Sequence, residues 1–200
     1  MKIALIYTAR SGSTSILKYF SKLKPDYECF NEPWFPWMVS NVYNGNVLNY
    51  DDLISKSKIF LKTTPINCPV SFETLIKDFD KVIFLLRRDK KEQIESSILL
   101  HKESSFLDST KRKYNIHEIT QYEIDVITKK YDDLNTLIET TAAKHSLPIY
   151  YYEDLYYGSF SSLFEELGLH YDEQYYKEFL DISNRYRDGT TEVKTSNTII

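Results

Sequence analysis

Short apolar runs alternate along the chain with stretches in which apolar residues recur at helical spacing. Five runs have the length of buried strands: residues 2–8, 27–30, 58–62, 81–86 and 149–152. The helical spacing predicts helices over residues 14–23, 70–79, 89–100, 117–143, 160–167 and 173–182. Strands that alternate with helices predict an α/β fold, a single domain over residues 1–200 with a mainly parallel central sheet flanked by helices.

Three segments depart from this alternation. Residues 31–46 are aromatic and contain Pro33 and Pro36, which disfavour a regular helix there. The aromatic run over residues 150–157 is interpreted as a strand and sheet edge. The polar tail, residues 188–200, is expected to be mobile.

Composition and charge narrow the functional classes. The chain has 200 residues and a formal net charge of −4. This charge argues against general nucleic-acid binding, which needs a basic field facing the phosphates. The apolar runs are too short for a membrane span or a secretion signal, so a cytoplasmic protein is expected. Cys29 and Cys68 are interpreted as two small buried hydrophobes, with a disulfide as the alternative. The pattern gives no indication of the oligomeric state.

The strongest candidate for a ligand site is the turn between the first strand and the first helix. It consists of Arg10, Ser11, Gly12, Ser13, Thr14 and Ser15. Gly12 permits a tight turn close to a ligand. The helix that follows presents unpaired N–H groups and a dipole that favour an anion, and Arg10 adds a planar cation that matches phosphate or sulfate oxygens. A common strand-to-helix turn capped by serines is the alternative.

With two further segments, this turn resembles the sulfotransferases that use 3′-phosphoadenosine 5′-phosphosulfate. Residues 10–14 resemble the family's R/K-S-G-S/T-S/T loop, in which an arginine is typical of carbohydrate and bacterial members. The stretch VIFLLRRDKKEQIESS, residues 82–97, resembles the family's strand and helix that carry an arginine and, eight residues later, a serine. The stretch YYEDL, residues 151–155, resembles the family's Y-E-D-L/M segment.

The resemblance implies a P-loop-like sulfotransferase fold and a set of cofactor-binding residues. The turn from Arg10 to Ser15 would hold the phosphosulfate. Arg88 and Ser96 would bind the 3′-phosphate, with Arg87 as a rival of Arg88. Tyr152 would lie near the adenine. No metal is implied. The family's basic C-terminal loop is poorly matched, although its chemistry is present in Arg185, Arg187, Gly189 and Lys194.

The resemblance also bears on the base that sulfuryl transfer needs for the acceptor hydroxyl. Cytosolic members use a histidine in a K-T-H-L/F-P segment, and here the matching segment is residues 61–65, with Thr64 in place of the histidine. Glu32 is the preferred base, because several carbohydrate sulfotransferases use a glutamate. A surface glutamate beside a proline turn is the alternative. Arg10 and Lys62 complete the expected catalytic residues.

The sequence therefore predicts an enzyme that moves a sulfuryl group from this cofactor to an acceptor hydroxyl. The acceptor would be a small molecule or a glycan, a carbohydrate or glycolipid by resemblance. A P-loop-class nucleotide kinase or NTPase is one alternative, although the Gly-Lys pair of its phosphate loop is absent. A nucleotide-binding protein without turnover is the other, which Thr64 keeps open.

Overall fold

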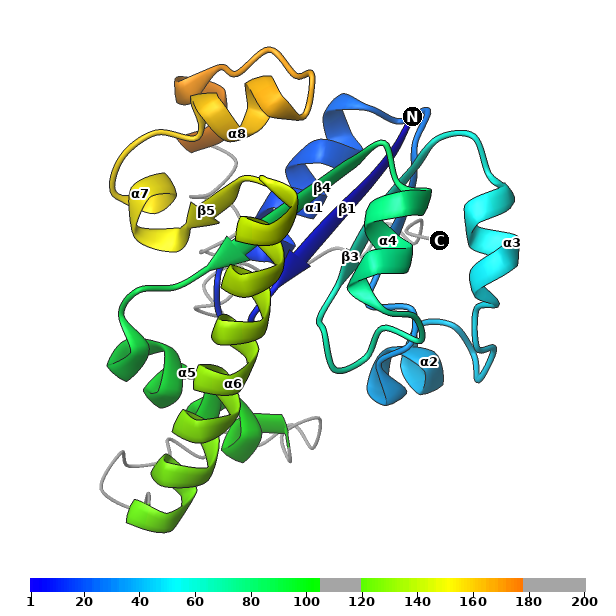
Figure 1. The fold of residues 1–200 in the computed structure, drawn as a ribbon. Helices are drawn as coiled ribbons and strands as arrows, with labels where there is room; N and C mark the ends of the chain where they lie inside the picture. Colours follow the sequence, from blue (N-terminus) through cyan, green and yellow to red (C-terminus); the bar gives the residue numbers. More distant parts are fainter. Residues whose placement is uncertain (105–119, 178–200) are drawn as a thin grey trace, which may run out of the picture.

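A five-stranded parallel sheet forms the centre of the molecule (Figure 1). The computed structural model describes residues 1–104 and 120–177. The strand order is β2-β3-β1-β4-β5, and every ladder is parallel. The strands are β1 (Lys2–Tyr7), β2 (Glu28–Asn31), β3 (Ile59–Thr63), β4 (Lys81–Leu86) and β5 (Ile149–Tyr151). The predicted α/β class with a mainly parallel sheet is confirmed.

Helices cover both faces of the sheet, as the crossovers between parallel strands require. They are α1 (Ser13–Leu23), α2 (Pro36–Asn41), α3 (Tyr50–Ser55), α4 (Phe72–Asp78), α5 (Lys90–Ser104), α6 (Gln121–His145), α7 (Tyr152–Tyr156) and α8 (Ser161–Glu166). One face of the sheet packs against α1 and α8, and the other packs against α3, α4 and α6. The result is a layer of helices, a sheet and a second layer of helices.

The inner strands are apolar at successive positions because both of their faces are buried. In β4, Ile83 and Leu85 belong to the core under α1 and α8, whereas Phe84 and Leu86 belong to the core under α4 and α6. Neighbouring side chains of a strand point to opposite faces. This alternation continues past the end of β4, so the side chains of residues 87 and 88 also point to opposite faces.

The strand order marks one position at the carboxyl edge of the sheet. From β1 the chain crosses toward β2, and from β4 it crosses in the opposite direction to β5. Ligands of parallel α/β sheets bind outside the carboxyl ends of the strands where the direction of crossing reverses. Residues 8–12 and 87–89 follow β1 and β4 at this position.

Three segments differ from their predicted conformation. The prolines predict no regular helix over residues 31–46, yet α2 begins at Pro36, because a proline at the first helical position loses no intrahelical hydrogen bond. The run 150–157 leaves the sheet after Tyr151 and forms α7. Helix α3 was not predicted, although Asn49 is a strong N-cap whose side chain accepts from two first-turn N–H groups.

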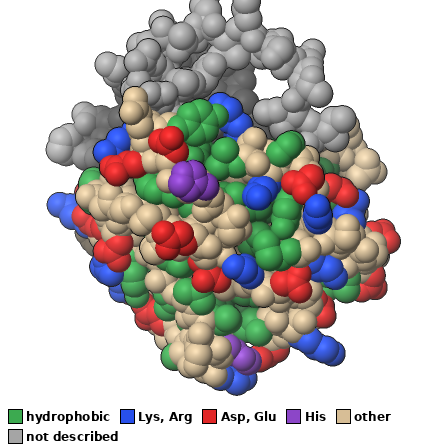
Figure 2. All heavy atoms as spheres, turned by 90° about the horizontal axis from the view of Figure 1, so that it is seen from above, with side chains coloured by type: hydrophobic (Ala, Val, Ile, Leu, Met, Phe, Trp, Pro, Cys, Tyr) green, Lys and Arg blue, Asp and Glu red, His purple; other side chains and the backbone are tan. Residues whose placement is uncertain are grey.

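Some predicted features lie outside the described residues: the end of the helix over residues 173–182, the tail, and the basic C-terminal residues. Residues 173–177 are helical. No helix of the described ranges is long and apolar enough to cross a membrane. On the face seen from above, acidic and basic side chains are interspersed (Figure 2).

Candidate functional site

The turn after β1 contains two residues with left-handed backbone. The φ angles of Arg10 and Gly12 are 66° and 78°, a conformation that is unfavourable for arginine and readily adopted by glycine. Gly12 is the N-cap of α1, and no described side chain caps this helix. The N–H of Ser15 donates to the carbonyl of Gly12 at 3.1 Å, whereas the N–H groups that precede it have no intrahelical acceptor. The amino end of this 11-residue helix therefore offers donors and the positive end of a dipole to an anion.

Buried polar atoms without partners gather around this turn. Ser11 is fully buried, and its Oγ has no hydrogen-bond partner among the described residues. Thr64 Oγ1 after β3 and Oε1 of Gln93, whose amide contacts the turn, are also buried without a hydrogen-bond partner among the described residues. A buried polar atom left without a partner costs about 1–3 kcal/mol. These atoms therefore indicate that a ligand or water completes the carboxyl edge of the sheet.

Lys62, which is buried, and Glu32, which is partly buried, form an ion pair next to the turn. Lys62 Nζ donates to Glu32 Oε1 at 2.9 Å, to Asn31 Oδ1 at 2.8 Å and to Thr14 Oγ1 at 3.2 Å. Lys62 lies in register with Asn31 of β2, so Glu32 follows directly at the end of that strand. Burial lowers the pKa of Lys62, and the charge of Glu32 opposes this shift. The ammonium ties the end of β2 to the first turn of α1.

Glu32 is held through one of its two carboxylate oxygens. The hydroxyl of Tyr7 donates to Oε1, the atom that also accepts from Lys62. Lys62 Nζ lies 4.5 Å from the centre of the Tyr7 ring. No described residue donates to Oε2. The φ of Glu32 is 49°, a strained value for a residue other than glycine. The carboxylate is therefore fixed in place with one oxygen left to accept a proton.

The side chain of Arg10 extends to α5. Its Nε donates to Ser96 Oγ at 2.7 Å. Gln93, also on α5, donates from Nε2 to Thr8 Oγ1 at 3.0 Å and to the carbonyl of Ala9 at 2.7 Å. The turn and the first half of α5 are thus one hydrogen-bonded unit, and Ser96 lies beside the arginine of the turn.

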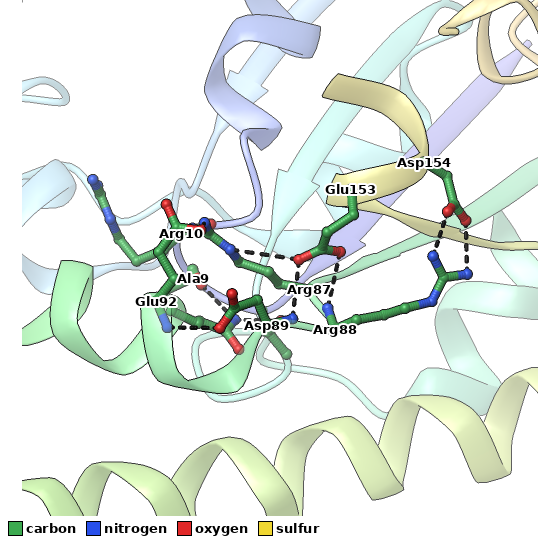
Figure 3. A network of polar contacts seen from close by, with 10 residues as sticks. Ala9, Arg10, Arg87, Arg88, Asp89, Glu92, Glu153 and Asp154 are labelled. Atoms are coloured by element: carbon green, nitrogen blue, oxygen red, sulfur yellow. Dashed lines mark hydrogen bonds and ion pairs between the residues drawn. The ribbon is translucent and has the colours of Figure 1, made fainter. Parts of the chain in front are cut away.

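Arg87 is the arginine that β4 directs toward the turn. Its side chain is 5% exposed, and its Nη1 donates to the carbonyl of Arg10 at 3.1 Å (Figure 3). It forms ion pairs with Glu92 and Glu153 and lies 4.4 Å from the centre of the Tyr152 ring. Side chains two residues apart in a strand point to the same face, and Leu85 faces α1. Arg87 therefore also points to the α1 side, where the turn lies.

Arg88 points away from the turn. It bonds both carboxylate oxygens of Asp154 and lies 3.9 Å from the centre of the Tyr151 ring. Figure 3 shows its side chain running away from Arg10 to reach Asp154. The structure therefore does not bring Arg88 and Ser96 together, since Ser96 contacts Arg10. Their joint binding of a phosphate stays a prediction that requires Arg88 to leave Asp154.

Helix α7 joins the two sides of this edge. The carboxylate of Glu153 accepts from the N–H groups of residues 88 and 89, both at 3.0 Å. The hydroxyl of Tyr156 donates to the carbonyl of Gly12 at 2.9 Å, and a Cβ at Gly12 would overlap the Tyr156 ring. Tyr152, predicted near the adenine, stacks on Tyr156 with ring centres 4.3 Å apart. Tyr156 therefore borders the turn directly, and Tyr152 adjoins the turn through this stack.

A cavity of 330 Å³ opens on the opposite, α6 side of the β4 and β5 ends. Arg88, Tyr151 and Asn135 line it, and Asn135 Oδ1 is buried without a partner. Two of its charged residues, Lys90 and Asp132, pair with each other. Of the predicted site residues, Arg88 and its rival Arg87 line this cavity, and Arg87 also contacts the turn.

Sequence reasoning missed three residues of the site: Tyr7, Asn31 and Tyr156. Tyr7 ends a strand immediately before the turn, and Asn31 immediately precedes Glu32, so a search for polar groups at strand ends would have selected both. Tyr156 carried no such signal, because its contact with Gly12 depends on the helix that replaces the expected strand.

Comparison with known proteins gives no assignment, because no family model and no curated protein matches the sequence. Among residues 1–104 and 120–177, no group of three or more His, Cys, Asp or Glu side chains is arranged to hold a metal ion. The arrangement itself offers a turn that leads into a helix N-terminus, the buried cations Lys62 and Arg87, and the fixed carboxylate of Glu32. These groups can bind a phosphorylated or sulfated ligand and accept a proton beside it.

Proposed function

We propose that the protein is a sulfotransferase with a P-loop-like core that uses 3′-phosphoadenosine 5′-phosphosulfate. The observation that carries this proposal is the ammonium of Lys62, which joins Thr14 of the anion-binding turn to the carboxylate of Glu32. Transfer of a group to a hydroxyl needs a bound anionic donor and a proton acceptor held in one fixed geometry. The resemblance of residues 10–14, 82–97 and 151–155 favours sulfuryl transfer over other group transfers.

The residues of the turn fit a nucleotide that carries several negative charges. The N–H groups at the start of α1 and the hydroxyls of Ser11, Ser13, Thr14 and Ser15 donate to the phosphosulfate. This contact would give the buried Ser11 Oγ a hydrogen-bond partner. Arg10 supplies a permanent charge. Ser96 and one of the two arginines after β4 bind the 3′-phosphate. The contact between Arg10 and Ser96 supports a single nucleotide that spans both groups.

The chemistry then follows from three side chains. When bound, the nucleotide supplies a sulfuryl group whose bond to the 5′-phosphate breaks, with its electron pair kept by the phosphate, as the acceptor oxygen bonds to sulfur. Glu32 takes the acceptor's proton at Oε2, and a positioned base typically contributes ~10²–10⁴-fold to the rate. Arg10 and Lys62 stabilise the negative charge that develops between them and the turn. The proposed acceptor is a carbohydrate or glycolipid hydroxyl.

Ligand binding tests the cofactor. Adenosine 3′,5′-bisphosphate at ~100 times its Kd should stabilise the fold by about 2.7 kcal/mol, which a thermal shift assay detects easily. ATP with Mg²⁺ serves as the comparison ligand under the same conditions. Stabilisation by ATP and Mg²⁺ but not by the bisphosphate would favour a nucleotide kinase and contradict the proposal.

Glu32→Gln tests the base. We expect this variant to keep its affinity for the bisphosphate and to lose at least about 100-fold in sulfuryl transfer, because an amide cannot take the proton. The matched control is Glu28→Gln, a glutamate of the same strand whose side chain pairs with Lys56 at the surface. If the wild type binds the bisphosphate but transfers nothing to sugars, lipids or phenols, the protein is a binding protein instead.

A further inference from the structure

Tyr7 makes a polar contact that its place in the core does not require. It is the last residue of β1, is 4% exposed, and packs its ring in the core under α1 and α8. A phenylalanine would fill the same space. The Tyr7 hydroxyl instead donates to Glu32. Burial, and then the charge of Glu32, raise the pKa of Tyr7, so the hydroxyl remains a donor at neutral pH.

Two contacts hold Glu32 at the same carboxylate oxygen. The hydroxyl of Tyr7, at the end of β1, donates to Glu32 Oε1. The ammonium of Lys62, on the neighbouring strand β3, donates to the same oxygen and to Thr14 of the anion-binding turn. The carboxylate is therefore held from two neighbouring strands at once.

The hydrogen bond from Tyr7 constrains the Glu32 carboxylate in a way that the ammonium of Lys62 alone does not. A carboxylate held only by the ammonium of Lys62 keeps its charge partner but can still rotate about its terminal bond, since an ammonium is a compact charge without a preferred plane. The phenol of Tyr7 adds a second, directional hydrogen bond from a rigid strand. A misplacement of a reacting group by about 1 Å can cost ~10²-fold in rate. The second contact is therefore important for transfer and dispensable for binding.

We propose that Tyr7 is a positioning residue for sulfuryl transfer, which together with Lys62 fixes Oε1 of Glu32 so that Oε2 receives the acceptor's proton. This inference rests on the proposed function. It assigns Tyr7 no contact with either substrate, and its effect passes through Glu32 alone.

Tyr7→Phe tests the inference, because it removes the hydroxyl and keeps the buried ring. We expect the affinity for adenosine 3′,5′-bisphosphate, measured by titration calorimetry, to change by less than about 2-fold, since the turn keeps its donors. Turnover of 3′-phosphoadenosine 5′-phosphosulfate with sugar and phenol acceptors should fall about 10-fold in kcat with little change in KM. In the Glu32→Gln background the same substitution should have no further effect, because the residue it positions is gone.

Tyr50→Phe is the matched control. Its hydroxyl also donates to a carboxylate, that of Asp78 at 3.1 Å, but this contact lies between α3 and α4, outside the site. We expect Tyr50→Phe to keep the turnover and the affinity of the wild type. Thermal unfolding of both variants shows whether they are equally folded.

The outcomes separate this inference from the proposed function. Equal turnover of Tyr7→Phe and wild type would overturn the positioning role and leave the sulfotransferase intact. A further loss in the double variant, or a loss of bisphosphate affinity in proportion to turnover, would overturn it as well, since Tyr7 would then act on the turn. A wild type that binds the bisphosphate and turns over no sulfuryl donor overturns both.

Discussion

The two sides of the sheet's carboxyl edge hold their charges in different ways. On the β2 and β3 side, Lys62 is 2% exposed and Glu32 is 17% exposed, and each is the other's ion-pair partner. On the β4 side, the side chains of Arg88 and Asp154 are 51% and 56% exposed. A buried charge that loses its partner is strongly destabilising, whereas an exposed pair contributes little. The β2 and β3 side is therefore locked, meaning that Lys62 and Glu32 cannot separate without a large loss of stability. On the β4 side, Arg88 can exchange Asp154 for another anion.

This difference suits the two tasks of a group-transfer site. A base has to be in place before the acceptor arrives, and the locked pair provides that without a conformational change. A nucleotide has to enter and leave, and an exposed arginine with a replaceable carboxylate partner allows it. Helix α7 adjoins both sides, since Tyr156 contacts Gly12 and Asp154 holds Arg88. The comparison yields three further predictions.

Lys62→Met should have the largest effect. It leaves the Glu32 carboxylate partly buried with only the Tyr7 hydroxyl as partner, so we expect the free energy of unfolding to fall by about 3 kcal/mol. Urea denaturation measures this change. The matched control is Lys56→Met, which removes the lysine of a more exposed lysine–glutamate pair with Glu28. Equal losses in the two variants would contradict the idea that the β2 and β3 side is locked.

Alkaline pH should reveal the environment of Tyr7 with a smaller effect. Its pKa in the folded state is raised by burial and by Glu32, whereas an unfolded chain ionises tyrosine near pH 10. The stabilisation from this shift is complete below pH 10 and is lost as the pH rises above it. At pH 11 the wild type should therefore have lost about 1.4 kcal/mol more than Tyr7→Phe. Urea denaturation of both proteins at pH 8, 10 and 11 measures the difference, and equal losses would mean that the hydroxyl is solvated.

Most of the fold followed from the apolar pattern because the strands are buried on both faces. In the run 81–86 every residue after Lys81 is apolar, so the run lacks the polar positions of an amphipathic helix, and the observed β4 has the same bounds. The prediction was wrong where the rule that proline interrupts helices was applied to a proline at a helix start. Pro36 was treated as a helix breaker, although its position at the start of α2 is the one that a helix tolerates.

The site was predicted less completely, because its contacts depend on strand order and on side-chain direction. The sequence indicated Glu32, Lys62 and the turn as separate candidates. Only the order β2-β3-β1 brings them together and adds Tyr7. Likewise, the eight-residue spacing between Arg88 and Ser96 does not determine in which direction the arginine side chain points. Strand parity sends Arg87 to the turn and Arg88 to the other face, so the spacing alone could not choose between them.

The smallest predicted effect decides whether Arg88 still binds the 3′-phosphate. For that it has to exchange Asp154 for the ligand, so Asp154 competes with the phosphate. Because an exposed pair is weak, removing this competitor in Asp154→Asn should tighten adenosine 3′,5′-bisphosphate binding only ~3-fold, whereas Arg88→Gln should weaken it by about 10-fold or more. Titration calorimetry measures both, with Glu73→Gln, which removes an equally exposed partner of Lys144, as the control. If neither variant differs from the control, the phosphate is bound by buried Arg87, and the β4 side is as fixed as the β2 and β3 side.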